Sequence, residues 1–189
     1  MPARLAQPHG TAWRRSACWL LLLTALLGAA LPAGAQDGTI VWIQPPSGSF
    51  QPGDTFAVQV RIDDVADLYG LDVRLAFDPD LLQVVEAQVM PETELLSPPW
   101  LIAYNLVDNE AGTIMYVVTL LSPHPPVSGS GAIFSFHFEA VQDGTALVEI
   151  SEQWLSDING DLIPATAAGA VYQVGFVGGY VSYVPLVSR

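Results

Sequence analysis

The chain has 189 residues, with 19 acidic residues against six arginines and no lysine, which gives a formal net charge of −13 at pH 7. Such a chain repels nucleic acid and anionic lipid, because proteins that bind them use arginine and lysine to displace counterions from phosphates. The single cysteine, Cys18, excludes an intramolecular disulfide, so a packed core has to stabilise the fold.

Both ends of the chain differ from its middle. Residues 1–35 are typical of a secretory signal peptide, because three arginines precede an apolar run over 17–31 and Ala33-Gly34-Ala35 forms a cleavage site. The run has about 15 residues, fewer than the roughly 20 of a membrane-spanning helix, which favours cleavage over an uncleaved anchor. Cleavage leaves three arginines against 19 acidic residues, a net charge of −16. Residues 178–189 form an apolar tail, for which envelope anchoring and a closing edge strand are both open.

The region between these ends, 36–177, is predicted to be one all-β domain. Runs of β-branched and aromatic residues are separated by Gly, Pro, Asp, Asn and Ser, and no long stretch keeps a helical period. Nine strands are expected, a number that suits a β-sandwich. Their approximate ranges are 39–43, 55–63, 68–77, 82–89, 101–107, 113–121, 131–140, 146–152 and 169–177.

Alternation of side chains assigns the faces of three strands. The predicted core positions are Leu71, Val73, Leu75 and Phe77 in the third strand, Ile114, Tyr116, Val118 and Leu120 in the sixth, and Ala132, Phe134, Phe136 and Phe138 in the seventh. In the seventh strand His137 falls on the opposite, more polar face. The outward side of the sixth strand is itself largely apolar, so that strand is either covered on both sides or binds something.

Residues with catalytic or metal-binding chemistry are few, and no catalytic residue, metal or cofactor is predicted. Only His124 and His137 follow the signal, without a nucleophile motif or a metal-ligand spacing. The segment 157–161 resembles the start of a calcium loop, but Leu162 and Ala168 occupy the required glycine and glutamate positions. A β-turn with Asx hydrogen bonds is expected there instead. For the cluster Asp63, Asp64 and Asp67, a calcium site and a solvated turn both remain open.

Exposed aromatic rings are the feature that would indicate sugar binding, because flat rings stack on pyranose faces. Three tryptophans follow the signal: Trp42, Trp100 and Trp154. Trp100 lies beside Pro98-Pro99 in a proline-rich loop and is the candidate for an exposed glycan-stacking ring.

The segment 68–85, with Phe77-Asp78-Pro79-Asp80 at its centre, resembles the third and fourth strands of cohesin domains. Proline fixes φ at this turn, and the aspartate side chain caps freed backbone amides. The Pro52-Gly53-Asp54 entry resembles the start of the family's second strand, and the segments 112–119, 131–140, 144–150 and 156–163 resemble later strands. The resemblance covers about 38–177 and implies a nine-stranded jelly-roll β-sandwich.

Cohesins bind dockerin modules of polysaccharide-degrading enzymes through one sheet, chiefly its third, fifth, sixth and eighth strands. The resemblance therefore implies a secreted or cell-surface, non-catalytic module that binds a dockerin-like partner. Two positions depart from the family pattern, Gly70 in place of an asparagine and Leu120 in place of an acidic residue. The predicted partner-binding residues are Gly70, Asp72, Arg74, Met115, Val117 and Thr119. Direct binding of polysaccharide and a structural adhesion role are the alternatives.

Overall fold

The computed structural model describes residues 38–175. The predicted signal peptide and the apolar tail lie outside this range. Within it every regular element is a β-strand, so no helix long and apolar enough to cross a membrane occurs there. The prediction of an all-β fold is confirmed.

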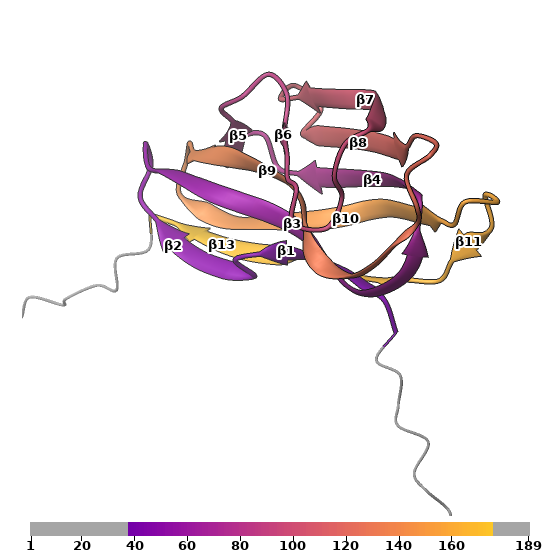
Figure 1. The fold of residues 1–189 in the computed structure, drawn as a ribbon. Coiled ribbons are helices and arrows are strands. Elements are labelled where there is room, and N and C mark those ends of the chain that lie inside the picture. The colour runs from indigo at the N-terminus through magenta and orange to yellow at the C-terminus, as the bar shows by residue number, and fades with distance from the viewer. Residues whose placement is uncertain (1–37, 176–189) are drawn as a thin grey trace, which may run out of the picture. The chain divides into compact units, whose positions relative to one another are not determined.

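The strands form two sheets, which are shown in Figure 1. The first sheet runs in the order β12 (Thr166–Ala168), β1 (Ile40–Gln44), β3 (Thr55–Leu68), β9 (Val127–Ala140) and β5 (Leu82–Val84), with β6 (Met90–Pro91) also paired to β9. The second sheet runs in the order β2 (Ser47–Phe50), β13 (Ala170–Val174), β10 (Gly144–Ser156), β4 (Gly70–Phe77), β8 (Thr113–Leu120) and β7 (Trp100–Asp108), with β11 (Leu162–Ile163) paired to β10. The third, fifth, sixth and eighth expected strands are β4, β7, β8 and β10, which lie side by side in the second sheet.

All nine expected strands have counterparts among the described residues, and four short strands occur in addition. These are β2, β6, β11 and β12, each two to four residues long. Segments of this length contain too little alternation to be recognised as strands, and β2, with the sequence Ser-Gly-Ser-Phe, consists mostly of residues typical of turns.

The core lies between the two sheets and is held by aromatic contacts across them. Tyr116 of β8 contacts Phe134 of β9, with ring centroids 4.8 Å apart, and Phe77 of β4 lies 5.1 Å from Phe138. Burial raises the pKa of Tyr116 to about 12. Every core position predicted from alternation is buried, with at most 7% exposure, so those face assignments are confirmed.

The polar face of β9 is covered by the segment between β5 and β7. Glu86 accepts hydrogen bonds from the backbone N–H of His137 at 2.9 Å and from its ring Nδ1 at 2.6 Å. Glu94 accepts one from the backbone N–H of Ala132 at 3.0 Å. This face is therefore occupied by the chain's own carboxylates, and Ser135 is only 8% exposed.

Two asparagines tie the edge strand β7 to the segment between β5 and β6, and the β7–β8 turn to β5 of the first sheet. Asn105 accepts a hydrogen bond from the backbone N–H of Val89 and donates one to its carbonyl, both at 2.8 Å. Asn109 makes the same pair of bonds with Val84, also at 2.8 Å. Each side-chain amide thus replaces a missing strand pairing and fixes the end of the sheet that carries the candidate site.

Candidate functional site

The six predicted partner-binding residues lie together on the outer face of the second sheet. They form three directly opposed cross-strand pairs between β4 and β8: Gly70 with Thr119, Asp72 with Val117, and Arg74 with Met115. Residues opposed in this way point to the same side of a sheet. All six are partly exposed, whereas their neighbours in sequence are core residues. We call the outer surface of β10, β4, β8 and β7 the binding face.

The strands on either side extend each pair into a row of four. Trp154 of β10 pairs with Asp72, and Tyr104 of β7 pairs with Val117, which places both rings in the central row. The remaining rows end in Ser156 and Glu152 on β10 and in Leu101 and Leu106 on β7. The apolar side of β8 is thus flanked by exposed apolar residues, and within residues 38–175 no further layer covers it.

Sequence reasoning missed the aromatic residues of this face because bulges reverse the alternation. The register of β10 shifts between Ile150 and Glu152, and that of β7 shifts between Ile102 and Tyr104. The strand predicted over 146–152 also ended before Trp154. The signal that a sequence offers for such a bulge is a large apolar or aromatic residue out of phase with the alternation of its strand.

The charged groups of the binding face form one cluster around Arg74. Its guanidinium donates to both carboxylate oxygens of Asp72, at 3.2 and 3.0 Å, and lies 3.0 Å from Glu152. The hydrogen bond to Asp72 is the main cause of the raised pKa of Arg74. One cation therefore holds two carboxylates on adjacent strands, which leaves a surplus negative charge at the edge of the apolar area.

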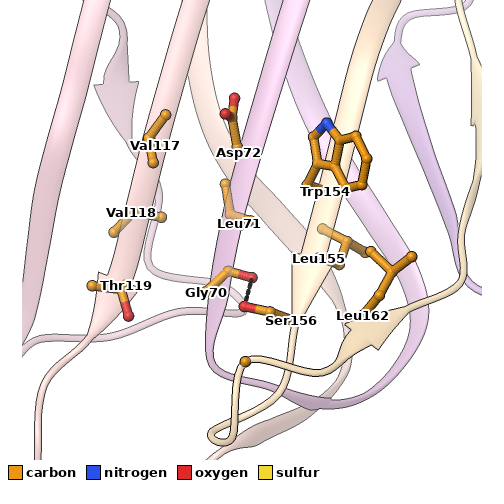
Figure 2. A pocket seen from close by; sticks show the side chains of 11 residues that line it. Gly70, Leu71, Asp72, Val117, Val118, Thr119, Trp154, Leu155, Ser156 and Leu162 are labelled. Carbon is orange, nitrogen blue, oxygen red and sulfur yellow. Dashed lines mark hydrogen bonds between the residues drawn. The ribbon is translucent and has the colours of Figure 1, made fainter.

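A hollow of about 500 Å³ opens at one end of the binding face, and Figure 2 shows the residues that line it. Gly70 lies on its floor between Thr119 of β8 and Ser156 of β10. Trp154 and Leu162 form the opposite wall, where β11 pairs with the end of β10. Four of the residues proposed from the sequence thus share a concave surface with Trp154 and Leu162, which the sequence did not place there: Gly70, Asp72, Val117 and Thr119.

The expectation that Trp100 is the exposed tryptophan is wrong. Trp100 is partly buried and packs against the core, because the part of β7 before its bulge turns this ring inward. Trp42 is also partly buried, and its ring N–H donates to Asp63 at 2.9 Å. Trp154 is 58% exposed and is the exposed tryptophan among residues 38–175. These three rings therefore form no planar row of the kind that sugar-binding modules use.

Leu120, which departs from the family pattern, does not belong to the binding face. It is 2% exposed and points into the core. Because side chains alternate along β8, the outward residue next to it is Thr119. Position 120 therefore offers no contact on this face, whereas Gly70, the other departure, lies on it.

The predicted turn at 157–161 is confirmed by its hydrogen bonds. The carboxylate of Asp157 accepts bonds from the backbone N–H groups of Asn159 and Asp161, both at 2.8 Å. These bonds, led by that from Asp161, lower the pKa of Asp157. In the part of the chain that the structure describes, no group of three or more His, Cys, Asp or Glu side chains is arranged to hold a metal ion.

The Asp-Pro turn after β4 also has the expected capping bond. Asp78 accepts from the backbone N–H of Asp80 at 3.0 Å through its side chain, while its carbonyl accepts from Leu82. The turn is locked from the other side by Gly112, whose carbonyl accepts from the N–H of Phe77 at 2.9 Å. The end of β4 opposite the hollow is thus fixed in place.

Comparisons with known proteins agree with the β-sandwich fold. A sequence-family model described as the cohesin domain matches residues 41–171. A non-cellulosomal cohesin from Archaeoglobus fulgidus is similar in structure, with a TM-score of 0.57 and 17% identity over 72% of this chain and 91% of the other. The seventh ScaB type I cohesin of Pseudobacteroides cellulosolvens is similar with a TM-score of 0.60 and 14% identity, over 80% of this chain and 97% of the other.

A type I cohesin–dockerin complex from Clostridium thermocellum contains a further similar chain, with a TM-score of 0.59 and 15% identity over 73% of this chain and 99% of that one. No protein with a curated description matches.

Proposed function

Because the chain belongs to the cohesin family, we propose that its binding face recognises a dockerin-like module of another protein. The observation that carries this proposal is the arrangement of three cross-strand rows, with an apolar centre on β8 and a charged cluster at Arg74. An apolar centre that desolvates on contact, bounded by polar groups, is the usual organisation of a protein interface.

We further propose that residues 36–177 act outside the cell, after cleavage of the signal peptide, as a non-catalytic module. The partner would then be attached to a polysaccharide-active enzyme or to a surface protein. The N-terminal signal pattern supports export, and the cohesin family is one of non-catalytic interaction modules. In this proposal the C-terminal tail, residues 178–189, is assigned to envelope anchoring.

The test uses the purified chain and recombinant dockerin modules from the same organism, with binding measured by isothermal titration calorimetry. Val117→Arg places a charge at the centre of the face, and Asp72→Ala removes one of the two carboxylates that Arg74 holds. The double variant is expected to lose binding at least tenfold, because a buried unpaired charge costs several kcal/mol. Its thermal midpoint should stay close to that of the wild type, since both side chains are partly exposed.

The control is Ala57→Arg, which introduces the same side chain at an exposed position of β3 in the other sheet. It should bind like the wild type. Equal loss of binding in both variants, or binding by the double variant that matches the wild type, would contradict the assignment of the face.

Direct binding of carbohydrate is the second candidate, because Trp154 and Tyr104 are exposed in one row of the binding face. Affinity electrophoresis in gels containing cellulose, xylan or chitin derivatives tests it. Retardation that Trp154→Ala abolishes would favour a glycan ligand over a dockerin-like module. Absence of binding to both classes would favour the third reading, a structural adhesion module.

A further inference from the structure

We propose that the hollow above Gly70 receives one large apolar side chain of the partner, presented on an otherwise basic surface. The inference rests on the proposed function, because it states what the partner inserts into the same face. It concerns the residues around Gly70, which set this chain apart from the family pattern.

The shape of the hollow depends on the missing side chain at position 70. A Cβ atom built on Gly70 would lie 3.0 Å from the hydroxyl of Ser156 and 3.6 Å from that of Thr119. The φ angle of Gly70 is not positive, so the backbone would accept a side chain there. Glycine at this position therefore serves to keep the floor open and is not required by the strand conformation.

The walls of the hollow favour an apolar group over a polar one. Trp154 and Leu162 are 58% and 59% exposed, and both stand beside the hollow (Figure 2). The hydroxyl of Ser156 donates to the carbonyl of Gly70 at 3.4 Å, and that of Thr119 donates to the carbonyl of Leu120 at 3.3 Å. Because these hydroxyls are engaged with the backbone, the guest gains mainly from burial of apolar surface.

Charge determines the surroundings of that apolar side chain. Residues 38–175 contain 18 acidic residues and two arginines, a net charge of −16. Both arginines are paired, Arg61 with Glu94 and Arg74 with Asp72 and Glu152. The acidic turn 157–161 contributes Gly160 to the lining of the hollow. A basic partner surface is attracted to this end of the face, whereas a second copy of the chain is repelled.

The first test requires no partner. The isotopically labelled chain is titrated with N-acetyl-leucinamide and N-acetyl-phenylalaninamide, and chemical shifts are followed by NMR. We expect weak, saturable shifts at Gly70, Thr119 and the indole N–H of Trp154, and their loss in Gly70→Asn, whose side chain fills the hollow. N-acetyl-asparaginamide should give none. Absence of saturable shifts with both apolar probes, or equal shifts with the polar one, would overturn the inference.

The second test uses any dockerin module that binds the wild type. Gly70→Asn should weaken binding at least about tenfold. The matched control Ala57→Asn adds the same amide at an exposed position of β3 in the other sheet and should have little effect.

The outcomes separate the two proposals. If Gly70→Asn leaves dockerin binding unchanged, the role of the hollow is refuted and the proposed function still stands. If the apolar probes bind but no dockerin module does, the hollow accepts apolar groups and the proposed function is refuted.

Discussion

Replacing Asn105 of β7 by alanine removes both hydrogen bonds between its side-chain amide and the backbone of Val89. Val89 is 2% exposed, so water cannot readily replace the lost partner. A hydrogen bond contributes about 0.5–1.5 kcal/mol net, and a buried backbone group left unpaired costs about 1–3 kcal/mol. With two bonds lost and partial relaxation of the loop, we expect the free energy of unfolding to fall by about 2–4 kcal/mol.

Urea denaturation measures this change, provided that the dependence on denaturant concentration keeps the same slope. Asn159→Ala is the control, because Asn159 lies in an exposed turn and its side chain bonds only to Asp157. That variant should change the free energy of unfolding by less than about 0.5 kcal/mol. An Asn105→Ala protein as stable as this control would refute the idea that this amide holds β7 to the segment between β5 and β6.

Three further results are expected. Gly112→Ala should lower the free energy of unfolding by about 3 kcal/mol or more in denaturation curves, because φ is +66° and a Cβ would collide with the carbonyl of Phe77. The control Gly53→Ala should lower it by only about 1 kcal/mol, because φ is +90° but the space around it is open. Burial opposes ionisation of Glu86, but hydrogen bonds from His137 outweigh it and lower the pKa of Glu86, so the ionised carboxylate stabilises the fold above pH 4.5 and this stability is lost as the pH falls through the lowered pKa. The thermal midpoint of Glu86→Gln should therefore fall less steeply with acidification than that of the wild type. Binding of a dockerin-like partner should weaken as sodium chloride is raised, since salt screens the acidic face, and calorimetry that finds no such dependence would contradict the charge argument.

The regular parts of the binding face were predictable from the sequence because β4 and β8 alternate without interruption. One side of each strand is fully buried, so a strict period of two identifies the other side. The pairing of Asp72 with Val117 follows once the two strands are known to be neighbours, and that neighbourhood came from the resemblance to cohesins.

The flanking parts were not predictable because their strands contain bulges. A bulge adds one residue and reverses which side chains face outward. Tyr104 and Trp154 therefore appear at positions that simple alternation does not place on the face, and Trp100 turns inward. The hollow is still further from the sequence, because it needs β11 to bring Leu162 beside Trp154, and a two-residue strand carries almost no signal.

Under the proposed function, the fold and the binding specificity of this chain depend on different residues. Core positions such as Val73 and Phe134 are fully buried, and their packing determines the sandwich. The outward residues of β4 contribute little to that packing, so their replacement should change partner preference with small effects on stability. Gly70 is the clearest case, since its backbone accepts a side chain and the nearest atom that a Cβ would meet is the hydroxyl of Ser156 at 3.0 Å. Membership of the family does not identify the partner. Candidate partners should therefore be tested for a side chain that fits the hollow above Gly70.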